Sequence, residues 1–265
     1  MILRTASTTV LRSLLFVMVC SATVALAQSE SDVKTMEKAR ALYMTGPIPH
    51  SISCGLTVDW DAFFAQMKIP MTDEVKARVE KLKSMKINIT SQDADHTDLK
   101  IEAAETPSNS ITDGLRMQMR GFFQMYWSLG FGQLMGKRGE AFELIKTPDG
   151  YSEKTNAGAM KVAVEMDKAY LVTGFDLQSP QLSAQVKPGF KAAEDGLLRL
   201  RSIDETIDMG SSKMVVSIHF DYQTVRVFAV PQHLTISVPG SYSFDYTMTG
   251  CQVSDEGSFA TPVAP

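Results

Sequence analysis

Short segments that alternate apolar and polar residues, separated by tight turns, run through most of this chain and constrain its fold more than any other feature. Ile87 and Ile89 alternate with polar residues, a polar turn at 93–96 follows, and Leu99 and Ile101 resume the alternation. A period of two is typical of strands with one buried face. Strands joined by such short turns pair antiparallel with their neighbours in sequence, because parallel pairing needs a crossover of a dozen or more residues.

The same pattern continues from residue 136 almost to the C-terminus. The predicted strands lie near 142–145, from Tyr151 onward, and near 160–166, 170–172, 198–203, 214–220, 225–230, 233–238 and 242–248, and Pro180 and Pro188 fall in a predicted loop. A sheet of that many strands has to curl because twist accumulates from strand to strand. We therefore predict an α+β fold in which a curled antiparallel β-sheet, an unclosed half-barrel, is covered by helices.

Three segments have helical periodicity instead. Residues 31–43 and 75–84 are amphipathic, the second by a thin apolar stripe only. Residues 111–135 are apolar on nearly every side, as in a helix that is buried or faces an apolar ligand. The candidate ligand-binding residues are its large apolar side chains Leu115, Met119, Phe122, Phe123, Tyr126 and Trp127. Met-rich surfaces adapt to varied ligands, but a stripe of this composition is also common in an ordinary core, and the sequence leaves both interpretations open.

The N-terminus has the pattern of an export signal. Arg4 and Arg12 precede an apolar run at 14–24, which is followed by Ala25-Leu26-Ala27. Signal peptidase cuts after small residues placed in this way, so residues 1–27 are predicted to be a signal peptide. The run is short for a membrane anchor, the alternative, and no later segment reaches the roughly 20 apolar residues that a spanning helix needs.

The remaining chain is predicted to be periplasmic or secreted and to have no transmembrane span. We expect one domain at 28–253 and an unstructured tail at 254–265. Removing Arg4 and Arg12 from the 26 basic residues leaves 24 against 30 acidic ones, a net charge of −6. This balance argues against a nucleic-acid partner, because nucleic-acid binding depends on clustered basic residues.

Two cysteines, Cys54 and Cys251, remain after the predicted cleavage, one near each end of the mature chain. In an oxidising compartment such a pair is expected to form a disulfide. Two buried free thiols are the alternative, because a count of cysteines does not establish connectivity.

Catalytic and metal-binding patterns are weak. His96 lies among Asp93, Asp95 and Asp98, but the glycine and the distant glutamate of a calcium loop are missing, so a solvated turn is the better interpretation. His219 and Asp221 share one face of a predicted strand, without a serine or cysteine nucleophile motif. We therefore predict no enzyme activity, no cofactor and no metal, with a hydrolase built from dispersed residues as a remote alternative.

The last third of the chain carries a resemblance to a known family. Its residues are Gly189-Phe190, then 195–198, 218–222 and 225–234, where a tyrosine-bearing strand, a short turn, an apolar strand and a proline follow in order. This resembles the outer-membrane lipoprotein-carrier (LolA-like) superfamily. The resemblance implies an N-terminal helix and an unclosed antiparallel barrel, with helices over its open side and an apolar cavity that binds acyl chains.

Two departures indicate a divergent member. Arg226 or Val227 stands where these carriers have a turn glycine, and the Cys54–Cys251 pair is not a general mark of the superfamily. The expected function is a periplasmic binding or carrier protein for a lipid or a lipoprotein acyl chain, without chemistry. The alternative is a cell-envelope interaction or sensory protein, with an envelope protein as partner, whose barrel is filled by its own side chains.

Overall fold

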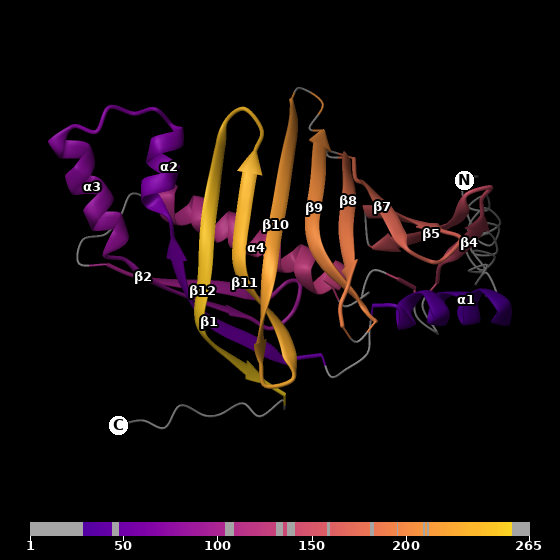
Figure 1. Ribbon diagram of the computed structural model, residues 1–265. Helices are drawn as coiled ribbons and strands as arrows, with labels where there is room; N and C mark the ends of the chain where they lie inside the picture. Colours follow the sequence, from indigo (N-terminus) through magenta and orange to yellow (C-terminus); the bar gives the residue numbers. More distant parts are fainter. Residues whose placement is uncertain are drawn as a thin grey trace, which may run out of the picture.

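The structure, a computed structural model, describes residues 29–43, 48–103, 109–130, 135–136, 141–157, 160–180, 183–194, 196–208, 210 and 212–255. The predicted signal peptide and nearly all of the predicted tail lie outside these residues, as do Phe131 and Leu134 of the predicted apolar helix. The described part contains four helices and one twelve-stranded sheet (Figure 1).

The elements follow one another in a simple order. The helices are α1 (Glu30–Ala41), α2 (Trp60–Gln66), α3 (Asp73–Lys83) and α4 (Asn109–Gly130). The first six strands are β1 (Ser51–Val58), β2 (Lys86–Ser91), β3 (Thr97–Glu102), β4 (Glu143–Lys146), β5 (Gly150–Ala157) and β6 (Met160–Asp167). The last six are β7 (Val172–Gln178), β8 (Ser183–Ala192), β9 (Leu198–Asp208), β10 (Lys213–Val225), β11 (Phe228–Val238) and β12 (Tyr242–Ser254).

Every strand pair in the sheet is antiparallel, and the sheet does not close on itself. The spatial order is β3-β2-β1-β12-β11-β10-β9-β8-β7-β6-β5-β4, so all neighbours but one are also neighbours in sequence. The exception is β1 beside β12, where Leu56 pairs with Met248 and Val58 with Tyr246. The prediction of an antiparallel, unclosed sheet is confirmed. Short turns or loops connect every neighbouring pair of strands except two: α2 and α3 lie between β1 and β2, and β1 and β12 lie at opposite ends of the described chain.

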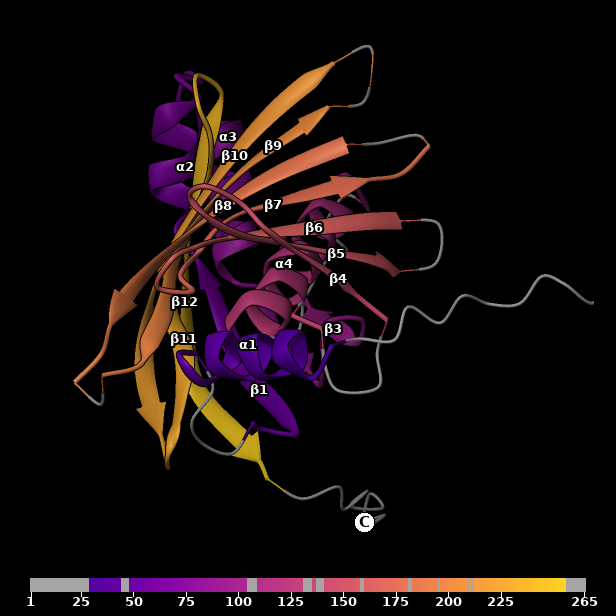
Figure 2. The same ribbon diagram turned by 90° about the vertical axis from the view of Figure 1, so that its right-hand side faces the viewer.

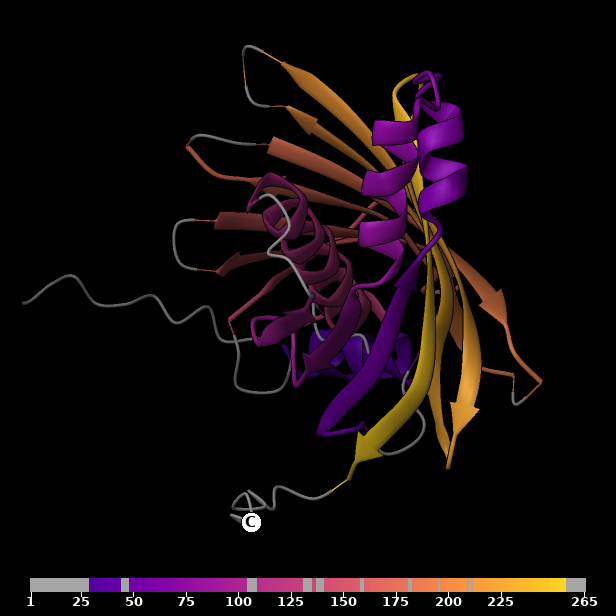
Figure 3. The same ribbon diagram turned by 90° about the vertical axis from the view of Figure 1, so that its left-hand side faces the viewer.

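The order of the strands fixes where α4 lies. The chain leaves the sheet at one edge, β3, and returns at the other edge, β4, so the segment between must pass across the open side. Twenty-two helical residues extend about 33 Å at 1.5 Å per residue. Figures 2 and 3 show α4 within the curve of the sheet, and ring contacts join it to β10.

Several predicted boundaries are wrong. No helix was predicted at α2, whose N-terminus is capped by the Asp59 side chain, and the apolar helix was predicted to reach Met135, which lies in a bend after α4. Pro188 was predicted to lie in a loop, and two strands divided near Pro231 were predicted where β11 is continuous. Both prolines lie inside strands and beside register irregularities, where a sheet tolerates the missing N–H group.

The predicted disulfide joins Cys54 of β1 to Cys251 of β12. It therefore bridges the one pair of neighbouring strands that are distant in sequence, 197 residues apart at the cysteines. Among the described residues, no helix is long and apolar enough to cross a membrane.

Candidate ligand-binding site

The six candidate ligand-binding residues all lie on α4 and point into the interior. Their side chains are no more than 2% exposed: Leu115, Met119, Phe122, Phe123, Tyr126 and Trp127. The Phe122 ring lies 5.2 Å from that of Phe220 on β10, centroid to centroid, and the Tyr126 ring lies 6.4 Å from that of Tyr222. The structure thus brings the six together as one apolar face, packed against the concave side of the sheet.

Hydrogen bonds fix this face of α4 to strands on both sides. The Trp127 indole Nε1 donates to Ser91 Oγ at 2.7 Å, at the end of β2. The Tyr126 hydroxyl donates to the Ala229 carbonyl of β11 at 2.9 Å, and its burial raises the pKa of that hydroxyl well above its usual value. A buried polar group without a partner is costly, so these bonds select the position of α4 as well as contributing to its stability.

Two further contacts come from the flank of α4. The Tyr246 hydroxyl of β12 donates to Gln118 Oε1, and Arg120 Nε donates to the Thr97 carbonyl of β3 at 3.1 Å. Burial also raises the pKa of Tyr246 above its usual value, so this hydroxyl keeps its proton over the physiological range. The helix is therefore anchored to β2, β3, β11 and β12 together.

Two charged residues, Arg40 of α1 and Glu153 of β5, hold the segment after α4. Arg40 of α1 donates from Nη2 to the carbonyl oxygen of Met135 at 3.0 Å and to that of Gly136. The Gly136 N–H donates to Glu153 Oε1 of β5 at 2.5 Å, and Glu153 is fully buried. This arrangement ties the C-terminal exit of α4 to the first helix and to the β4 side of the sheet.

A small cavity with a mixed polar and apolar lining lies at the base of α3. Its volume is about 140 Å³, and it is lined by Leu56, Thr57, Val58, Trp60, Leu82, Lys83, Met85 and Ile87. Sites for drug-sized ligands usually enclose about 300–1,000 Å³. An apolar cavity of about 150 Å³ can bind benzene, so this slightly smaller cavity cannot hold a whole acyl chain. In the sequence, the only feature related to this cavity is the thin apolar stripe of the predicted helix at 75–84. None of the six candidate residues of α4 lines the cavity.

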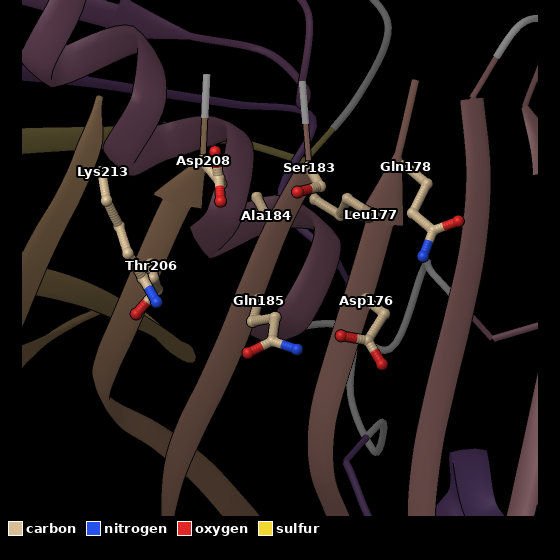
Figure 4. Close-up of a pocket in the computed structure, with 9 residues that line it drawn as sticks. All are labelled: Asp176, Leu177, Gln178, Ser183, Ala184, Gln185, Thr206, Asp208 and Lys213. Atoms are coloured by element: carbon tan, nitrogen blue, oxygen red, sulfur yellow. The ribbon is translucent and has the colours of Figure 1, made fainter. Parts of the chain in front are cut away.

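Two shallow hollows lie among polar side chains elsewhere on the sheet. Figure 4 shows the first, about 210 Å³, at the ends of β7–β10, lined by Asp176, Leu177, Gln178, Ser183, Ala184, Gln185, Thr206, Asp208 and Lys213. The second, about 380 Å³, is lined by Lys191, Arg201, His219, Phe220, Asp221, His233 and Thr235. Neither holds a nucleophile paired with a base.

The two histidines considered for chemistry have ordinary surroundings. His219 and Asp221 are exposed and line one hollow, but the Asp221 carboxylate accepts from Arg201 Nη1 at 3.0 Å. His96 lies 2.8 Å from Asp93 through Nδ1, and this hydrogen bond raises the pKa of the imidazole. Within the described ranges, no group of three or more His, Cys, Asp or Glu residues could hold a metal ion.

Glu205 is an acidic side chain on an otherwise apolar face. It lies two residues from the buried Ile203 on β9, so both side chains point to the same side of the sheet. Its strand neighbours are Val186 and Val216. Desolvation raises the pKa of the Glu205 carboxyl, so folding disfavours its charged form.

We expect Glu205→Gln to stabilise the protein at pH 7 and to have a smaller effect in acid. The folded carboxyl binds a proton more readily than the unfolded one, so its contribution to stability falls as the pH rises through the interval between the two pKa values. Thermal unfolding of both proteins at pH 4 and pH 7 checks this. A variant that is less stable than the wild type at pH 7 would contradict it.

Comparison with protein-family models, with curated proteins and with solved structures finds no match for this chain.

Proposed function

We propose that the protein is an exported binding or carrier protein for a lipid or another acyl-bearing ligand, and that it performs no chemistry. The proposal rests on one observation, the apolar concave face of the sheet against which a single helix, α4, places six large apolar side chains. In this proposal, the ligand occupies that face by taking the place of the inner side of α4. The unclosed antiparallel sheet supports the resemblance to lipoprotein carriers, of which this chain would be a divergent member.

The packing of α4 decides how a ligand would bind. Its six large apolar side chains are no more than 2% exposed, so an acyl chain cannot reach the concave face of the sheet while α4 is in place. Exposing six large apolar side chains costs about 9–18 kcal/mol at about 1.5–3 kcal/mol each. Burying a chain of about 16 carbons returns about 13 kcal/mol at about 0.8 kcal/mol per methylene. The two terms are similar, so exchange between α4 and an acyl chain is energetically feasible.

The hydrogen bonds of α4 oppose this exchange. Trp127 and Tyr126 lose their partners, Ser91 and the Ala229 carbonyl, when the helix moves away. Each such bond contributes about 1 kcal/mol net. Without ligand, the closed form, in which α4 lies against the sheet, is therefore favoured over the open form, in which α4 has moved away. The apparent affinity for a ligand equals the affinity of the open form multiplied by the fraction of protein in that form.

A second candidate is supported by the same anchors and by the near-complete burial of the six side chains. In this alternative the protein is a cell-envelope interaction or sensory protein, α4 is a permanent part of its core, and an envelope protein binds to the outer surface. The two candidates differ in whether α4 ever leaves the sheet.

Trp127→Phe separates them. The change removes the N–H···O bond to Ser91 and keeps an aromatic ring, so the open form becomes more populated. If a ligand exchanges with α4, we expect a fluorescent fatty acid to bind the variant about five- to tenfold more tightly than the wild type, since a hydrogen bond contributes about 1 kcal/mol and 1.4 kcal/mol is a factor of ten. If α4 is a permanent part of the core, we expect neither protein to bind the fatty acid and the variant to lose only about 1 kcal/mol of stability.

Tyr43→Phe is the matched control, because it also removes buried hydrogen bonds but lies on the α1 side of the core. The Tyr43 hydroxyl accepts from the Val172 N–H at 2.6 Å and donates to the Tyr170 carbonyl, and burial raises its pKa to about 12. This variant should lose stability without a gain in affinity for the fatty acid.

Native mass spectrometry of protein purified from a bacterial periplasm is an independent experiment. A carrier is expected to retain a bound lipid, and a mass equal to that of the protein alone argues against a carrier.

A further inference from the structure

The loop between α2 and α3 carries the densest group of exposed apolar side chains in the described structure. Met67, Ile69 and Met71 are 43%, 37% and 45% exposed and alternate with Lys68 and Pro70. Figure 1 shows this loop at one end of the helix pair, to the side of β12. Single exposed apolar residues are ordinary, but three within five residues form a patch, and exposed apolar patches indicate surfaces that bind a protein, a ligand or a membrane.

The loop has a defined backbone and rests on a rigid base. Lys68 has a positive φ of 50°, and its N–H donates to the Ala65 carbonyl at 3.3 Å, which ends α2 and turns the chain outward. The Thr72 N–H donates to the Pro70 carbonyl at 2.8 Å. The local hydrogen bonds therefore hold the apolar residues in place at the tip.

The base of the helix pair is joined to β12. The rings of Phe63 and Phe244 stack with centroids 4.2 Å apart, and the Ser243 N–H donates to Gln66 Oε1 at 2.9 Å. Lys83 of α3 pairs with Asp61 of α2 at 2.8 Å. These contacts hold the helix pair, and with it the loop at its tip, in a fixed position relative to β12.

The charges around the tip leave one cation without a partner. The carboxylates of α2 and α3 pair with basic side chains of the same helices: Asp61 and Glu80 with Lys83, Asp73 with Lys76, and Glu74 with Arg78. No described carboxylate lies within ion-pair distance of Lys68. A lone positive charge among apolar side chains is complementary to a surface that has phosphates outside and hydrocarbon beneath.

We propose that the α2–α3 loop, residues 67–71, is a membrane-contact site that inserts Met67, Ile69 and Met71 at the headgroup boundary of a lipid bilayer. Lys68 meets the lipid phosphates. A convex tip offers no enclosure for a small ligand, and a flat lipid surface accepts it without a matching cavity. This inference rests on the proposed function, because it identifies the surface from which an acyl-bearing ligand would be taken or to which it would be delivered.

Vesicle flotation tests the proposal with the mature, disulfide-bonded protein. We expect the wild type to float with phosphatidylcholine vesicles and to bind more strongly when phosphatidylglycerol is added. The triple variant Met67→Ser, Ile69→Ser, Met71→Ser should lower the partition coefficient by about tenfold or more, because the inserted apolar area is lost. Lys68→Glu should weaken binding mainly to the vesicles that contain phosphatidylglycerol.

Val227→Ser is the matched control, since Val227 is 74% exposed in the turn between β10 and β11, far in sequence from the tip. It should leave flotation unchanged. The proposal is overturned if the wild type does not float, if the triple variant floats as the wild type does, or if the triple variant only abolishes a dimer. Co-purified lipid is measured separately by native mass spectrometry, so failure of the carrier proposal and failure of the membrane contact give different results.

Discussion

Replacement of both Cys54 and Cys251 by serine is expected to lower the free energy of unfolding by about 5 kcal/mol. The disulfide closes a loop of 197 residues, and the entropy that such a bridge removes from the unfolded chain grows with loop length. It also joins β1 to β12, the two neighbouring strands that lie farthest apart in sequence. Urea unfolding of the variant beside the oxidised wild type measures the loss.

The reduced wild type should match the double variant, and a reducing agent should have no further effect on the variant. Domains of this size have about 5–15 kcal/mol of stability, so the loss would be a large part of the total. If the oxidised and reduced proteins unfold at the same urea concentration, the bridge does not hold the ends of the sheet together in solution.

Phe122→Ala is expected to lower stability by about 3 to 5 kcal/mol. The ring is fully buried and lies 5.2 Å from the rings of Phe123 and Phe220, so its removal leaves a cavity between α4 and the sheet. Met117→Ala is the control on the same helix, because Met117 is 72% exposed and should cost no more than about 0.5 kcal/mol. Equal effects of the two changes would mean that α4 does not pack as the structure places it.

The same variant bears on function. If a fatty acid exchanges with α4, it should restore part of the stability that Phe122→Ala removes, because a ligand that binds only the folded protein stabilises it. If α4 is a permanent part of the core, the fatty acid should have no effect on the unfolding midpoint.

Local patterns predicted the hairpins because each is decided within a few residues. The alternation at 87–89 and 99–101 and the turn between them correspond to β2 and β3. The same reasoning failed at Pro188 and Pro231, where a bulge on the sheet compensates for the missing N–H. It also missed α2, a helix of seven residues that is stabilised by contacts with β12 and not by a strong apolar period.

The sequence by itself determined the antiparallel hairpins and the segment that forms the apolar helix, because turns and periodicity are local properties. Only the tertiary structure decided that β1 lies beside β12 with Cys54 and Cys251 joined, that the rings of α4 fill the concave face, and that Met67, Ile69 and Met71 remain exposed. The hydrophobic effect is not directional, so an apolar side chain is stabilised by burial against any apolar surface. Which surface it meets therefore depends on the tertiary fold.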